Sequence, residues 1–144
     1  MVATDITPKL LVKGRKNIHA RNIIFLKEHA EHLSFKNSTF DIVCGVSILH
    51  HVDTNKALKE AYRVLKPHGQ VFFTEPNLLN PNIWLGLHIP WLRSRMEFSP
   101  DETALIRWKV GEMLESIGFK KVLVRNYDFL HPLTPTYLIN LVGK

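Results

Sequence analysis

The chain has 144 residues, a length that usually corresponds to one globular domain. Hydrophobic residues make up 45% of it and charged residues 22%, which excludes disorder, and no apolar run reaches the roughly 20 residues of a membrane span. A single cysteine, Cys44, excludes an internal disulfide framework, and the N-terminus lacks a signal-peptide pattern, so we expect a cytoplasmic protein without a membrane partner. The net charge is +6, but the basic residues are scattered, which favours a solvated surface over nucleic-acid binding.

Short runs of β-branched and aromatic residues predict the strands of the fold. These runs are residues 2–5, 23–26, 40–46, 70–74 and 119–127. Their apolar interiors alternate with helical segments, which predicts an α/β, Rossmann-like fold with a mostly parallel sheet and helices on both faces, a three-layer sandwich. In such folds ligands bind outside the carboxyl ends of the strands, so the residues there are the first candidates for a site.

Capping residues predict where the helices begin and end. Thr7-Pro8 starts the first helix, because threonine caps and proline fits the first helical position. Asp53 caps the second helix, which we expect to end at a turn over residues 66–69. Ser99-Pro100-Asp101-Glu102 forms a capping box for the third, with Ile106 on its buried stripe and Gly118 at its end.

An acidic residue, Asp5, follows the first predicted strand. A carboxylate at this position can accept hydrogen bonds from both hydroxyls of an adenosine ribose, and charged bonds of this kind contribute about 1.5–3 kcal/mol. The alternative is that Asp5 only caps the turn before Thr7. The same acid would serve nicotinamide dinucleotides and other adenosine ligands equally well.

Five segments form an ordered series, and the stretch from Phe40 to Asn77 is its most specific part. The segments are residues 5–8, 30–35, 40–43, 48–52 and 63–69. The series closely resembles the class I S-adenosylmethionine-dependent methyltransferases, specifically the small-molecule type 11 group. The resemblance extends from Val2 to about Tyr127 and is loosest over residues 77–98.

The resemblance implies S-adenosyl-L-methionine as the cofactor and assigns residues to its parts. Asp5 would hold the ribose and Ile6 would pack on the adenine. The backbone N–H of Ala30 would meet the adenine edge, and Val46 and Ser47 would form the floor of the methionine end.

His29 departs from the family pattern, because many relatives have an aspartate there that accepts a bond from the adenine amino group. A neutral imidazole could accept the same bond, whereas imidazolium could not. We therefore expect cofactor binding to weaken below about pH 6.5, the unperturbed histidine pKa. The alternative is a surface histidine without a ligand.

His50 and His51 lie beside the methionine end in this resemblance, and either is a candidate general base or simply part of the pocket wall. On an extended backbone the two neighbours would point in opposite directions, and no third ligand is evident, so we expect no metal. Glu75 and Asn77 end a strand at the ligand edge, where they could bind or deprotonate the substrate, or only make the pocket polar.

Residues 77–98 have no clear period and are predicted to be an irregular insertion on the substrate side. Trp84 and His88, with Trp91 and Arg93, are its most ligand-like members, although tryptophans in a loop often only anchor it to the core. We expect residues 77–98 to determine which small-molecule methyl acceptor binds.

A cofactor fold of this kind begins with a strand and a glycine-rich turn roughly 20 residues before the ribose acid, which in this chain is residue 5. We therefore expect residues 1–144 to form a single partial methyltransferase domain, incomplete at the N-terminus and short at the C-terminus. Exposed sheet edges would then favour self-association.

Three functions remain open at this point. The first is methyl transfer to a small molecule by a fragment or diverged family member, which needs few catalytic side chains because the sulfonium is already activated. The second is the NAD-type dinucleotide-binding half of an oxidoreductase. The third is a non-catalytic remnant that pairs with another chain.

Overall fold

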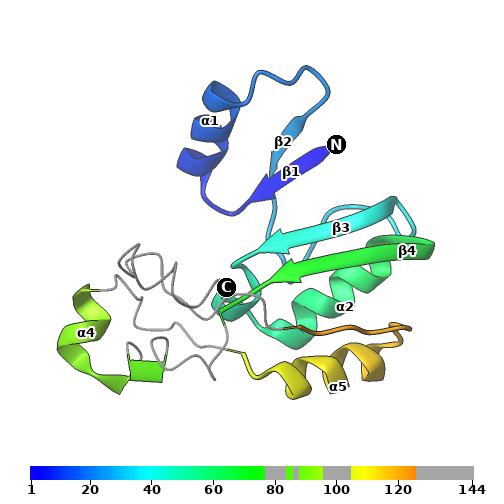
Figure 1. The fold of residues 1–144 in the computed structure, drawn as a ribbon. Coiled ribbons are helices and arrows are strands. Elements are labelled where there is room, and N and C mark those ends of the chain that lie inside the picture. The colour runs from blue at the N-terminus through cyan, green and yellow to red at the C-terminus, as the bar shows by residue number, and fades with distance from the viewer. Residues whose placement is uncertain (77–83, 86–87, 96–104, 126–144) are drawn as a thin grey trace, which may run out of the picture. The chain divides into compact units, whose positions relative to one another are not determined.

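The computed structural model describes residues 1–76, 84–85, 88–95 and 105–125 (Figure 1). The chain divides into two compact bodies. The first contains Met1–Cys44 and Val52–Phe72, and the second contains Gly45–His51 and the described residues from Phe73 onward. Strands and helices alternate through most of the described residues, as the sequence predicts, but residues 28–39 join two strands without a helix.

The first strand pair consists of β1 (Val2–Asp5) and β2 (Ile24–Lys27), which run parallel with Asp5 opposite Lys27. Helix α1 (Pro8–Asn17) connects them and begins where the Thr7-Pro8 signal predicts, although the Thr7 side chain makes no capping bond. Gly14 allows the close approach of α1 to β2, because a Cβ there would lie 2.8 Å from the Phe25 ring.

The second strand pair consists of β3 (Phe40–Val46) and β4 (Leu65–Thr74), whose arrows point the same way in Figure 1. A short 3-10 helix, η1 (Leu49–His51), and α2 (Thr54–Val64) connect them. The predicted cap of α2 is confirmed, since Asp53 Oδ1 accepts a bond of 3.1 Å from the Lys56 backbone N–H. The buried face of α2 supplies most of the described core, through Ala57, Leu58, Ala61 and Val64.

The predicted turn over residues 66–69 is wrong, because β4 already begins at Leu65 and continues through it. Proline lacks a backbone donor, but an edge strand of a two-stranded pair tolerates that loss at Pro67. The backbone still departs from regular strand geometry at His68, whose φ of 67° lies in the left-handed region.

In the second body the structure describes α4 (Pro90–Arg95) and α5 (Arg107–Ile117). The predicted capping box at residues 99–102 lies outside the described residues. Ile106 is the half-buried N-cap of α5, and the backbone before it bonds outside the helix: the Leu105 N–H donates to Pro76 O at 3.2 Å. Gly118 ends α5 with a φ of 115°, as predicted.

The strand predicted over residues 119–127 is absent from residues 119–125, and the last two of its residues lie outside the described part. The Phe119 N–H bonds to Leu114 O and so completes the end of α5. An alternating pattern becomes a strand only when a neighbouring strand accepts its hydrogen bonds. Within the part of the chain that the structure describes, no strand pairs with this segment.

None of the described helices is both long enough and apolar enough to cross a bilayer.

Candidate functional site

Asp5 lies at the carboxyl end of β1, where its carboxylate is only half engaged. Its Oδ1 accepts a bond of 2.7 Å from the Thr7 N–H, and its Oδ2 has no hydrogen bond to any residue that the structure describes. The Glu28 N–H donates to Asp5 O at 3.3 Å, which brings the carboxyl ends of β1 and β2 together. Both readings of Asp5 are therefore compatible: one oxygen caps the turn, and the other fits a hydroxyl donor such as a ribose. Ile6, the next residue, is 52% exposed.

His29 and Ala30 follow β2 in a tight turn that is closed by a bridge from His29 to His32. The Nδ1 atom of His29 accepts a bond of 3.2 Å from the Glu31 N–H. A neutral ring in this arrangement carries its proton on Nε2, so that nitrogen is a donor rather than the acceptor that the sequence suggests. The weakening of cofactor binding at low pH stays a prediction.

In the second body, the chain leaves β3 through a strained turn. Ser47 has a φ of 50°, and its N–H donates to Thr74 O at 2.8 Å. A non-glycine residue in the left-handed region costs on the order of 1–3 kcal/mol and is held only where surrounding contacts require it. Val46 is 76% exposed directly before this turn. A Cβ at Gly45 would lie 2.8 Å from the Phe73 ring, so this position requires glycine.

Glu75 holds the residues that follow this turn. Its Oε1 accepts bonds of 2.9 Å from the backbone N–H groups of both Ile48 and Leu49, and its Oε2 lies 2.6 Å from His50 Nδ1. The side chains of His50 and Glu75 are only 3% and 9% exposed. Because an ionised carboxylate can only accept, the His50 Nδ1 carries a proton and donates it to Glu75.

This geometry gives Glu75 a different task from the one expected. Both of its oxygens are engaged by the segment from Ile48 to His50, so it positions that segment rather than offering its carboxylate to a substrate. Sequence reasoning missed this contact. The available signal was an acid placed directly after an apolar strand, opposite a turn whose N–H groups need acceptors.

On an extended backbone, His50 and His51 would point in opposite directions, but in the structure they do not. Both lie on η1, where the turn brings their ring centroids to 4.0 Å with the planes tilted by 44°. His50 is buried, whereas His51 is exposed. Of the two candidate bases, His51 is therefore the one that a ligand can reach.

Trp84 and His88 of the predicted insertion are stacked, with ring centroids 4.6 Å apart and planes inclined by 21°. The His88 Nδ1 atom lies 2.7 Å from Trp84 O, which fixes the histidine ring against the tryptophan. Both residues are exposed, and Trp84 retains 48% of its accessible surface. Asn77, the other candidate at this edge, lies outside the described residues.

Residues 1–73 match the model of a methyltransferase domain of the type 11 group. The demethylmenaquinone methyltransferase of Lactobacillus johnsonii is 32% identical over 86% of this chain and 59% of its own length. The ubiquinone/menaquinone biosynthesis C-methyltransferase UbiE of Bartonella quintana is 31% identical over 85% of this chain and 55% of its own length. The chain thus spans less than two thirds of each of these relatives.

A similar fold occurs in the crystal structure of a putative methyltransferase from Bacillus halodurans. The match has a TM-score of 0.67 and 26% identity, and covers 82% of this chain and 52% of that one. This likeness confirms the Rossmann-like α/β fold. Because the family match covers half of the chain and includes all five segments of the ordered series, the chain belongs to the class I S-adenosylmethionine-dependent methyltransferases of the type 11 group, whose cofactor is S-adenosyl-L-methionine.

Proposed function

We propose that this chain serves methyl transfer from S-adenosylmethionine to a small-molecule acceptor. The observation that carries the proposal is the half-engaged Asp5 carboxylate at the carboxyl end of β1, where ligands of such folds bind. Asp5, Ile6 and Ala30 of the first body would hold the adenosine end of the cofactor. The contact of Val46 and Ser47 with its methionine end stays a prediction. The bound cofactor supplies a methyl group on a sulfonium, which needs alignment with the nucleophile more than it needs a catalytic side chain.

Cofactor binding is tested by calorimetric titration with S-adenosylmethionine and S-adenosylhomocysteine, with NAD as the comparison. We expect both sulfur ligands to bind and NAD not to bind. Asp5→Asn retains an oxygen for the Thr7 N–H but replaces Oδ2 with a donor, so it should weaken binding by about 10- to 100-fold. NAD binding without S-adenosylmethionine binding would overturn the proposal.

We propose an electron-rich aromatic ring, such as a quinol, as the acceptor. The names of the two relatives specify quinone methylation, one of them at carbon, and the stacked Trp84–His88 pair offers a flat exposed surface for such a ring. Trp84→Leu should raise the acceptor KM severalfold and leave the cofactor KM unchanged. Trp108→Leu is the matched control, because Trp108 is similarly exposed, at 51%, on α5. Methylation of a primary amine in preference to a reduced naphthoquinone would contradict this assignment.

We propose His51 as the group that takes the proton from the acceptor hydroxyl, because it is exposed while its neighbour His50 is buried against Glu75. His51→Gln should lower kcat and leave the thermal unfolding midpoint unchanged. His50→Gln should lower that midpoint. Equal loss of stability in both variants would refute this division of roles.

Pairing with another chain is the second candidate, and exposed apolar side chains on the strands favour it. Ile24 is 59% exposed, Ile42 58% and Phe72 56%. Surfaces of this kind are typical of a chain that associates. Size-exclusion chromatography with light scattering, with and without S-adenosylmethionine, tests the candidate, and a monodisperse monomer at tens of micromolar would contradict it.

A further inference from the structure

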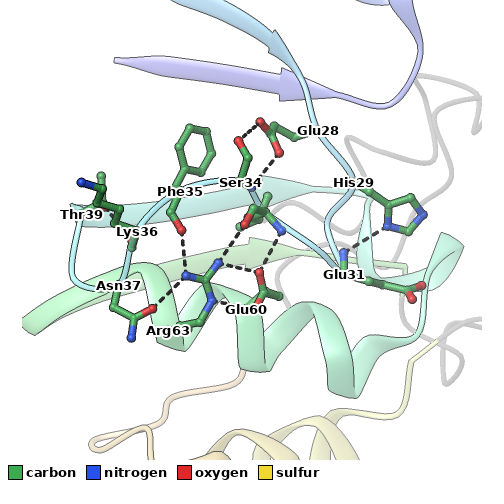
Figure 2. A network of polar contacts seen from close by, with 11 residues as sticks. Glu28, His29, Glu31, Ser34, Phe35, Lys36, Asn37, Thr39, Glu60 and Arg63 are labelled. Carbon is green, nitrogen blue, oxygen red and sulfur yellow. Dashed lines mark hydrogen bonds and ion pairs between the residues drawn. The ribbon is translucent and has the colours of Figure 1, made fainter.

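The loop from Glu28 to Thr39, which joins β2 to β3, is fastened to α2 by two charged side chains (Figure 2). These are Glu60 and Arg63, in the last turns of the helix, and we call them the α2 clamp. Apart from the bridge between His29 and His32, the loop has no helix or strand of its own. Its conformation therefore depends on side-chain contacts and, at its end, on two backbone bonds: the Ser38 N–H donates to Arg63 O at 3.0 Å and the Thr39 N–H to Val64 O at 2.7 Å.

Arg63 uses all five of its N–H donors in the α2 clamp. Nε and Nη2 donate to Glu60 at 2.8 and 2.7 Å, which forms a bidentate ion pair. The remaining donors reach the loop: Nη2 bonds to Leu33 O at 2.9 Å, and Nη1 bonds to Phe35 O at 2.7 Å and Asn37 Oδ1 at 2.9 Å. The planar fork of arginine makes this many directed contacts possible, and lysine could not reproduce them.

Glu60 completes the attachment by accepting a bond of 2.8 Å from the Leu33 N–H, so both backbone groups of Leu33 are held by the clamp. The pKa of Glu60 lies below its ordinary value, chiefly because Arg63 donates to it, and the same pairing raises the pKa of Arg63. Both groups therefore remain ionised in the folded protein at neutral pH.

The start of the loop is tied to the other end of the same helix. Glu31 Oε1 accepts a bond of 2.9 Å from the N–H of Asp53, the residue that caps α2. Glu28 also binds Ser34, through the N–H at 2.9 Å and through the hydroxyl, which draws the two ends of the intervening segment together. The turn that carries His29 and Ala30 is thus framed by contacts on both sides.

We propose that Arg63, acting with Glu60, is a positioning residue for the cofactor: it touches no ligand, but it presets the loop that presents His29 and Ala30 at the carboxyl end of β2. The inference rests on the function proposed above, because it requires this loop to meet the adenine. A loop that is already in its bound conformation loses less conformational freedom when a ligand binds, so preorganisation appears directly as affinity. Sequence patterns did not reveal the role, since Arg63 reads as an ordinary cation near a helix end.

Two measurements on Arg63→Ala, Arg63→Lys and Glu60→Gln test the proposal. The first is hydrogen–deuterium exchange of the loop amides without cofactor, and the second is calorimetric binding of S-adenosylhomocysteine. Lys66→Ala is the matched control, because Lys66 is a nearby cation whose ammonium group pairs with Asp41, outside the loop. All variants are compared at a temperature at which circular dichroism shows them to be folded.

We expect Arg63→Ala to speed exchange of the Leu33 and Ser34 amides, which bond to Glu60 and Glu28, by at least tenfold and to weaken ligand binding by about the same factor, with Arg63→Lys and Glu60→Gln intermediate and Lys66→Ala unchanged. Where turnover is measurable, KM for S-adenosylmethionine should rise while kcat at saturating cofactor and the acceptor KM stay constant. Unchanged exchange in Arg63→Ala would overturn the proposal whatever the ligand result. Faster exchange with wild-type affinity would also overturn it, whereas a wild-type chain that binds no ligand would refute the proposed function instead.

Discussion

Replacing Glu75 by glutamine should expose the role of its carboxylate, because the change preserves size and removes one of the two acceptor oxygens. The carboxylate serves the N–H groups of Ile48 and Leu49 and the Nδ1–H of His50. A glutamine oxygen can retain the two backbone bonds, but the amide group then opposes a donor on a ring that is 3% exposed. A buried donor left without a partner costs about 1–3 kcal/mol, so we expect Glu75→Gln to lower the free energy of unfolding by that amount.

Urea unfolding followed by tryptophan fluorescence measures this loss, and all three tryptophans of the chain belong to the same body as Glu75. Glu112→Gln is the control, because Glu112 is an exposed glutamate on α5 and its replacement should change stability by less than about 0.5 kcal/mol. Nitrogen NMR of the imidazole shows which nitrogen of His50 carries the proton: if it stays on Nδ1, the full loss is expected, whereas a proton on Nε2 lets Nδ1 accept from the amide and should make the loss smaller. A variant as stable as the control, with the His50 proton still on Nδ1, would refute the reasoning.

Three further changes test other parts of the structure. The pKa of Glu60 is held below its ordinary 4.5, chiefly by its bond from Arg63, so the stability that Glu60 contributes is complete above that pH and is lost as the pH falls through the lower folded value. Glu60→Gln should therefore flatten the acid limb of a curve of stability against pH, and an unchanged limb would contradict this. Gly45→Ala should destabilise by about 1–3 kcal/mol in urea unfolding, because its Cβ would meet the Phe73 ring at 2.8 Å, and a neutral result would mean that the ring moves aside freely. His68→Gly should raise the thermal unfolding midpoint, because glycine tolerates the φ of 67° without strain. The gain should correspond to at most about 1 kcal/mol, since glycine also has more conformational freedom in the unfolded chain. A lower midpoint would argue against strain at this position.

The elements that the sequence predicts correctly are those whose signals are local. The apolar run of β3 and the Asp53 cap of α2 depend on residues adjacent in the chain. The errors occur where residues distant in the sequence determine the secondary structure. Residues 66–69 carry turn-forming types but extend along β4 beside β3, and residues 119–125 alternate like a strand without a neighbouring strand to bind.

The candidate site divides in the same way. The position of Asp5 at the end of β1 follows from the strand pattern, and the structure adds only that one of its oxygens caps a turn. The buried His50–Glu75 pair joins residues 25 positions apart, and no spacing rule predicts such a contact. The two histidines were expected on an extended backbone, but a 3-10 turn places their rings on the same side.

Glu60 and Glu75 have the same structural role at different places in the fold. Glu60 accepts one backbone N–H of a connecting segment and Glu75 accepts two, and each is paired with a nitrogenous side chain, Arg63 or His50. Side chains engaged in this way should affect folding or loop order first, and ligand binding only through those changes. Asp5 retains an oxygen that no described residue engages, and mutating it should change affinity with little effect on stability. Comparing unfolding free energies with ligand affinities across these residues therefore separates the groups that build the site from those that would touch the cofactor.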